Sequence, residues 1–164
     1  MADDPRAWAE ITAAIVAAAA ALTGLIFVAL SINLDPIIRL GGVADVALQA
    51  IAVLTVVLMT GALVLVPGQS KSLLAGELVL LGVGLIVVVA WLFVRTWRDS
   101  DAAYRGKRLQ TAILNALPGL GFGIAGVSLA LGTGGGLYWL VPGWTLGMLA
   151  GIVNAWILLV EVKR

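Results

Sequence analysis

The 164-residue chain contains neither cysteine nor histidine. Without cysteine it can form no disulfide framework and no thiolate site. Without histidine it lacks the usual protein ligand of haem, zinc and copper, and the usual proton shuttle at neutral pH. We therefore expect no cofactor and no bound metal, and we expect that the chain is not an enzyme.

Charged residues are also scarce. They make up 12% of the chain, whereas a soluble domain carries about 25%. The net charge is only +1, and we expect no basic patch interleaved with aromatic residues outside the bilayer. Such a patch is the footprint of nucleic-acid binding, so we expect no nucleic-acid partner.

Most of the sequence is instead taken up by five long apolar runs, which contain a single charged side chain, Glu77. The runs are Ile11–Leu34, Val46–Val66, Ser72–Val94, Leu109–Leu131 and Leu137–Val160. Each has 21 to 24 residues. At a rise of about 1.5 Å per residue, each can cross the roughly 30 Å hydrocarbon core of a lipid bilayer. Their continuous rather than alternating hydrophobicity disfavours a β-barrel. We predict an all-α integral membrane bundle of five transmembrane helices in a single domain.

The cationic residues predict how these helices are oriented. With five crossings, one face holds only Arg6 and Lys71, whereas the other holds eight lysine and arginine residues. The eight are Arg39, Arg95, Arg98, Arg105, Lys107, Arg108, Lys163 and Arg164. Because cationic short loops stay in the cytoplasm, we predict an external N-terminus and a cytoplasmic C-terminus. The alternative is four crossings, in which 109–131 lies in the membrane plane or re-enters it.

The cationic segment 95–108 is explained by topology alone, with contact to anionic lipid head groups or to a cytoplasmic protein as alternatives. Most tryptophans fall near the ends of the runs, where their amphipathic rings favour the membrane interface. Trp144 fits less well, because it lies about a turn deeper.

Small residues recur at helical spacing, which lets helices pack closely in a bilayer. The most regular stripe is Gly143, Gly147 and Gly151. Packing within the monomer is one interpretation, and an interface with a second copy is the other. Because five helices enclose little interior, we expect a homo-oligomer, with this stripe as its candidate interface. A different membrane protein is an alternative partner.

Polar side chains within the runs are the candidates for a pore or ion site. Glu77 lies about five residues, or roughly 7–8 Å, inside the outer end of its run, and Glu10 lies at the same face. These carboxylates handle a cation or proton, or they simply reach interfacial water. Gln49, Asn115 and Asn154 fall in the inner half, where amides hydrogen-bond between helices or line a vestibule.

Pro118 predicts a kink near the middle of the membrane. Proline has no N–H to donate, and its ring clashes with the carbonyl four residues back. Gly119 follows it directly. Interrupted helices at this depth occur at transporter sites, although a structural kink is the commoner meaning.

The segment AAAAALTGLIFVALSINL at residues 17–34 resembles the first helix of small, uncharacterised bacterial multi-spanning membrane proteins. The resemblance implies a multi-pass protein of the bacterial cell (cytoplasmic) membrane and transfers no catalytic residue. From these patterns we expect a structural or regulatory role in a homo-oligomer or larger membrane assembly. The alternative is a channel or transporter for ions or small solutes.

Overall fold

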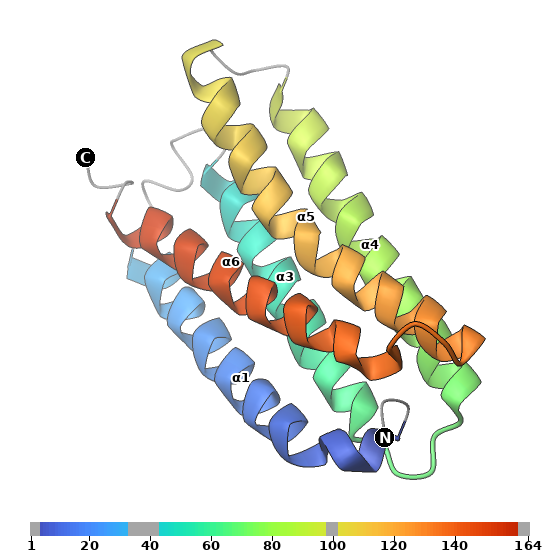
Figure 1. Ribbon diagram of the computed structural model, residues 1–164. Coiled ribbons are helices and arrows are strands. Elements are labelled where there is room, and N and C mark those ends of the chain that lie inside the picture. Colours follow the sequence, from blue (N-terminus) through green and yellow to red (C-terminus); the bar gives the residue numbers. More distant parts are fainter. Residues whose placement is uncertain (1–3, 33–42, 98–101, 161–164) are drawn as a thin grey trace.

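The computed structural model describes residues 4–32, 43–97 and 102–160, and every regular element within these ranges is a helix. Figure 1 shows their arrangement. In chain order they are η1 (Pro5–Trp8), α1 (Ala9–Ile32), α3 (Val43–Val64), α4 (Lys71–Trp97), α5 (Ala102–Leu131), η2 (Gly136–Trp139) and α6 (Leu140–Val160). Five of them are long and apolar enough to cross a membrane. The prediction of an all-α fold with five such helices is confirmed.

Several helix boundaries differ from the sequence expectation, and the differences around the segment 95–108 change its structure most. α4 continues to Trp97 and α5 begins at Ala102, so most of the segment 95–108 is helical rather than a loop. Hydrophobicity marks only the part of a helix that suits hydrocarbon, whereas the helix continues wherever its residues favour helical backbone. Alanine, arginine, lysine and glutamine make up most of 102–110, and all four are strong helix formers.

The five long helices alternate in direction, so the start of α1 and the end of α6 lie at opposite ends of the bundle (Figure 1). One end contains η1, the α3–α4 turn at 65–70 and the α5–α6 connection with η2; we call it the η end. The other contains the end of α4 and the start of α5; we call it the α4–α5 end. This alternation is the arrangement that five consecutive membrane crossings require.

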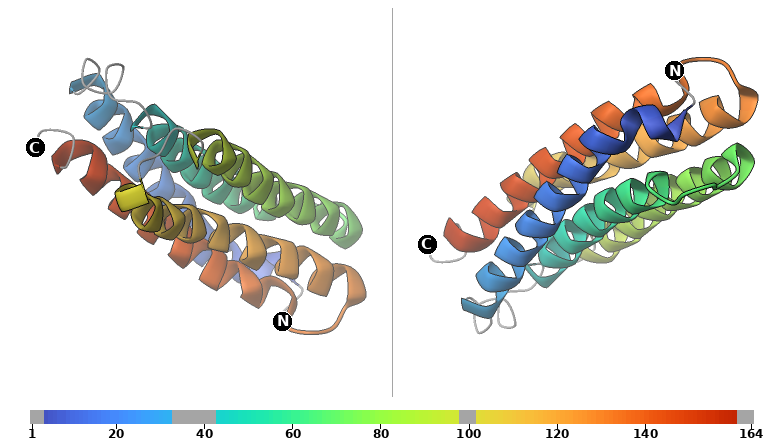
Figure 2. Two further views of the ribbon diagram at one scale, coloured as in Figure 1. Left: turned by 90° about the horizontal axis from the view of Figure 1, so that it is seen from above. Right: turned by 90° about the horizontal axis from the view of Figure 1, so that it is seen from below.

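α3 is the central helix, because it contacts all four of the other long helices. α1 packs against α3 and α6, and it lies between them in the view from below (Figure 2, right). α4 packs against α3 and, most extensively, against α5, which also contacts α6. The five helices therefore close into one bundle, with no long helix attached to only a single neighbour.

α4 and α5 approach closely because glycines lie where the two backbones meet. A Cβ atom at Gly82 would lie only 2.6 Å from the carbonyl oxygen of Gly119 and 2.7 Å from the nitrogen of Gly123. At Gly126 it would lie 2.5 Å from the carbonyl oxygen of Ala75. Backbone atoms cannot yield as a flexible side chain can, so this contact depends on glycine, as close helix pairs in membranes do.

The bundle interior is mostly apolar and is occupied by side chains from every long helix. Its largest buried cluster includes Ala19 of α1, Val57 of α3, Leu78 of α4, Phe122 of α5 and Trp144 of α6. All five of these side chains are fully buried. Large side chains thus fill the centre of the bundle, at the level where the predicted oligomer stripe also packs.

That α6 glycine stripe (Gly143, Gly147 and Gly151) lies inside a single copy of the chain. Its nearest neighbours are, in order, Phe122 of α5, Val57 of α3 and Leu54 of α3. A Cβ atom at Gly143 or Gly151 would lie 2.7 Å from the nearest side-chain carbon. The expectation that the stripe forms an oligomer interface is corrected, because α3 and α5 already cover it. Packing within the monomer, the other interpretation, describes the structure.

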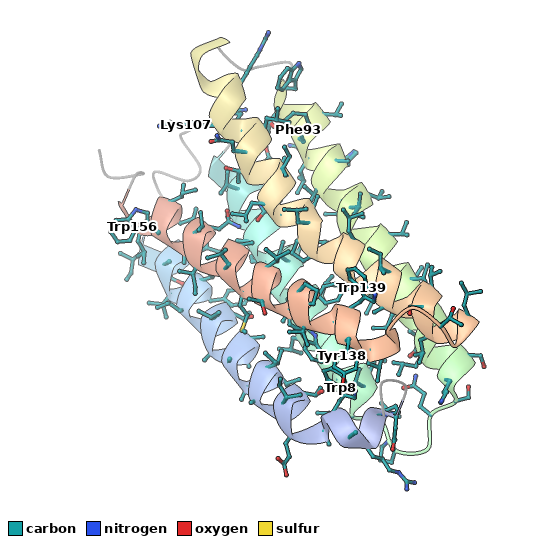
Figure 3. All side chains as sticks on the ribbon, in the orientation of Figure 1. Trp8, Phe93, Lys107, Tyr138, Trp139 and Trp156 are labelled. Carbon is teal, nitrogen blue, oxygen red and sulfur yellow. The ribbon has the colours of Figure 1, made fainter. Side chains whose placement is uncertain are left out.

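The η end is held together by contacts between its short segments. The Ser128 hydroxyl donates to the carbonyl of Thr133 and accepts a 2.8 Å hydrogen bond from the backbone N–H of Gly136. Trp8 of η1 meets Tyr138 of η2 edge to face, with ring centroids 4.8 Å apart (Figure 3). The ring contact joins the start of α1 to the α5–α6 connection, and the Ser128 hydrogen bonds hold that connection against the end of α5.

Candidate functional site

The structure brings together the three predicted inner-half amides, which we call the amide chain (Gln49, Asn115 and Asn154). The Nδ2 of Asn154 donates to the Oδ1 of Asn115 at 2.7 Å. The Nδ2 of Asn115 donates in turn to the Oε1 of Gln49 at 2.8 Å. Because these residues belong to α6, α5 and α3, two consecutive hydrogen bonds cross three helices.

The amide chain is deeply buried: Asn115 and Asn154 are 0% exposed and Gln49 is 6% exposed. A buried polar group without a partner costs about 1–3 kcal/mol, so the bonds favour the one alignment of the helices that lets all three amides meet. Inter-helix bonds of this kind contribute about 0.6 kcal/mol on average in membrane proteins, with values up to about 1–2 kcal/mol. The geometry matches the first of the two alternatives, hydrogen bonding between helices.

One atom of the amide chain is left over. The Oδ1 of Asn154 is buried and has no hydrogen-bond partner within the described part of the chain. A neutral amide only donates and accepts hydrogen bonds. The chemistry that this site supports is therefore the alignment of helices by hydrogen bonds, rather than proton transfer.

A second buried polar contact, not anticipated from the sequence, joins α3 to α6. The indole Nε1 of Trp144 donates to the Oγ1 of Thr60 at 3.1 Å, and that hydroxyl donates to the carbonyl of Val57 at 2.9 Å. Both Trp144 and Thr60 are fully buried. The depth of Trp144 in its run was the available signal, because a buried indole N–H usually finds a partner.

Glu77 lies at the η end, half-buried in the second turn of α4. Its carboxylate accepts a hydrogen bond from the Nε2 of Gln69 in the α3–α4 turn. The other side-chain atom of that amide, Oε1 of Gln69, is buried without a partner among the described residues. The contact places several hydrogen-bond acceptor atoms near the N-terminus of α4. Gln69 was not among the predicted site residues.

Glu10 does not join this pair. It is exposed in the first turn of α1, a helix that packs against α3 and α6, whereas α4 packs against α3 and α5. Within residues 4–32, 43–97 and 102–160, no group of three or more acidic side chains is placed to hold a metal ion. The two predicted carboxylates are thus on separate helices rather than in one site.

Pro118 and Gly119 are both buried within α5, which continues as one helix to Leu131. A Cβ atom at Gly119 would lie 2.6 Å from the carbonyl oxygen of Gly82 on α4. On the other side, Pro118 lies next to Gly147 of α6. This pair therefore marks the level at which α5 is packed between two neighbours.

Comparison with protein-family models, with curated proteins and with solved structures finds no match for this chain. The class of protein is therefore defined by its fold and by the candidate site. They define a single bundle of five long apolar helices whose buried amides hydrogen-bond across three of them.

Proposed function

We propose that the chain is a multi-pass integral protein of the cell membrane, with an external N-terminus and a cytoplasmic C-terminus. The alternating helix directions and the unequal charges of the two ends support this orientation. Among the described residues, the α4–α5 end carries Arg95, Arg105, Lys107 and Arg108 with one acid, Asp45. The η end carries Arg6 and Lys71 with three acids, Asp4, Glu10 and Glu77. The positive-inside rule assigns the more cationic end to the cytoplasm.

The absence of cysteine allows a direct test of this orientation. Thr133→Cys marks the η end, and Gly106→Cys marks the α4–α5 end without removing a charge; both positions are exposed. In intact cells a membrane-impermeant maleimide should label Thr133→Cys only, and Gly106→Cys should react after permeabilisation. The opposite labelling pattern would contradict the orientation. Finding the protein in the soluble fraction of lysed cells, rather than in the membrane fraction, would contradict membrane insertion.

We propose a structural or regulatory role, within a homo-oligomer or a larger membrane assembly, for this bundle. The observation that carries the proposal is the use of the buried amides: they bond to one another between helices. Large side chains such as Trp144 and Phe122 occupy the centre. A bundle whose internal polar groups hydrogen-bond between its helices is held in one arrangement. Such a bundle is suited to present a rigid surface to other membrane components.

A conduit for ions or small solutes is the second candidate. Two observations favour it: the unpartnered Oδ1 of Asn154 and the half-buried carboxylate of Glu77 beside Gln69. Purified protein in liposomes should show no ion flux above protein-free liposomes if the structural role is correct. If the protein does conduct ions and Glu77→Gln reduces the flux, the conduit would replace the structural role. Glu10→Gln, which changes an exposed carboxylate, is the matched control.

Helix α1 is where we place the contact with a second copy. Only 17% of its most apolar stretch is buried in the bundle, against 28–56% for the other four long helices. Its outer surface includes the exposed small residues Ala17, Ala20 and Gly24. Small exposed residues allow the close approach on which helix association in lipid depends.

Measurement of the particle mass in lipid nanodiscs tests this contact. Gly24→Leu should reduce the oligomer to the monomer, whereas Gly76→Leu on α4 should not. The two glycines are matched, since both are exposed and neither has an atom within 4 Å of its Cβ position. A monomeric unaltered protein would remove the homo-oligomer from the proposal, and equal effects of the two variants would remove α1 as its interface.

A further inference from the structure

Contrary to the expectation of no basic patch interleaved with aromatic residues, the α4–α5 end carries cationic side chains beside tryptophans, which we call the basic surface. Its members are Trp91, Arg95, Trp97, Arg105, Lys107 and Arg108. All of them are exposed except Arg108, which is half-buried. Lys107 is seen at this end, together with Phe93 of α4 and Trp156 of α6 (Figure 3). Orientation of the helices explains an excess of positive charge, but it does not require aromatic partners for those charges.

Two arginines of the basic surface rest on tryptophan rings. The guanidinium carbon of Arg95 lies 5.7 Å from the ring centroid of Trp91, and that of Arg105 lies 5.2 Å from the ring centroid of Trp97. Both distances are within the roughly 6 Å range of cation–π attraction. Stacking of this type occupies the face of the guanidinium and leaves its N–H edge for an anion.

The two helices that carry the surface are tied together at this point. The Nη1 of Arg108, on α5, donates to the carbonyl of Thr96, on α4, at 2.9 Å. This contact joins the start of α5 to the last turn of α4. The cations of the two helices therefore lie at the same end of the bundle, on helices that are joined to each other there.

The basic surface continues directly into an apolar flank. Val87 and Val94 of α4 are each 58% exposed, and Trp91, between them in sequence, is 59% exposed. Tryptophan favours the depth of lipid head groups, because its ring is apolar and its N–H is polar. Along α4 towards its end, exposed apolar side chains thus come before the cations. A helix that passes from hydrocarbon to lipid head groups meets its surroundings in the same order.

From this juxtaposition we propose that the basic surface binds the phosphate groups of anionic phospholipids. The inference rests on the membrane insertion proposed above. Anionic phospholipids supply the complementary charge at the depth where the tryptophans lie, and guanidinium N–H pairs match phosphate oxygens in geometry. A water-soluble acidic partner would satisfy the cations but would leave the exposed tryptophan and valine side chains in water.

Tryptophan quenching by brominated lipids tests the proposal in reconstituted protein. Vesicles contain phosphatidylcholine with a minority of phosphatidylglycerol, and one or the other lipid is brominated at the same mole fraction. We expect stronger quenching by brominated phosphatidylglycerol. The double variant Arg95→Gln, Arg105→Gln should remove most of that difference, because each basic residue near the surface changes the local preference about fivefold, equivalent to about 1 kcal/mol.

Two further variants keep the result interpretable. Arg6→Gln, Lys71→Gln removes two cations from the η end and should leave the preference unchanged. Arg95→Lys, Arg105→Lys keeps the charges and should retain most of it. Equal quenching by the two brominated lipids, or an equal loss in the η-end control, would overturn the proposal. Flotation of the protein with the vesicles reports membrane insertion separately, so failure to insert is distinguishable from failure to select a lipid.

Discussion

Asn154 on α6 donates a 2.7 Å hydrogen bond to Asn115 on α5, at a point where both side chains are fully buried. Asn115 also donates to Gln49 on α3 and so belongs to two inter-helix bonds at once. In an apolar bundle, sliding one helix past another costs little in hydrophobic burial, whereas it breaks these bonds. The amide chain therefore selects the alignment of three helices.

Asn115→Leu is the substitution that tests this role. It keeps the shape of the side chain but leaves the Oε1 of Gln49 and the Nδ2 of Asn154 buried without their partner. We expect the free energy of unfolding to fall by about 1–3 kcal/mol, as measured by reversible unfolding in mixed detergent and SDS micelles.

The matched control removes all three amides: Gln49→Met, Asn115→Leu and Asn154→Leu. Replacing every partner with an apolar group of similar shape leaves no polar atom unsatisfied, so part of the lost stability should return. A triple variant less stable than Asn115→Leu alone would show that the amides do more than bond to each other.

The Trp144–Thr60 contact should contribute separately to stability. Thr60→Val keeps the volume but removes the hydroxyl that accepts from the indole N–H of Trp144. We expect a loss of about 1–2 kcal/mol, most of it from the unpartnered N–H. In a double-mutant cycle with Trp144→Phe, measured by the same unfolding assay, the two changes should be coupled. Strictly additive effects would exclude a role for the hydrogen bond.

Gly82→Ala should weaken the contact between α4 and α5. The new methyl group would lie within 2.6–2.7 Å of backbone atoms of Gly119 and Gly123, so the helices must separate. Overpacking of this kind costs about 1–3 kcal/mol. Gly76→Ala, on the same helix with nothing within 4 Å, should instead be neutral or stabilising by up to about 1 kcal/mol. Thermal unfolding in detergent compares the two, and equal effects would contradict the close contact.

Gly147→Leu distinguishes the two interpretations of the α6 glycine stripe. In the structure Gly147 faces Val57 of the same chain, so the larger side chain should destabilise the monomer, by about 1–3 kcal/mol or more. Unfolding in detergent measures this loss, and particle mass in nanodiscs reports the oligomeric state. A variant of unchanged stability that no longer self-associates would restore the stripe as an oligomer interface.

Hydrophobicity predicted the helices well but their ends less well. The apolar run at 109–131 located α5 in the bundle, yet the helix begins at Ala102 because most of its first turns are alanine, arginine, lysine and glutamine, which favour helical backbone. The inner-half position of Gln49, Asn115 and Asn154 predicted amides capable of bonding. It did not indicate that they meet, since they lie on three helices whose relative rotation has no signature in the sequence.

The sequence by itself determined the class of structure: five uninterrupted apolar runs form five helices, because backbone hydrogen bonds within each run need no partner from elsewhere. The tertiary structure alone decided which surfaces meet. Small residues permit close packing on any side of a helix, and only the assembled bundle shows the glycines of α6 covered by α3 and α5. The tertiary structure also decided which partners the polar residues bond to. Asn115 bonds to two helices and Glu77 to a neighbouring turn, because these partners come together only after the helices have packed.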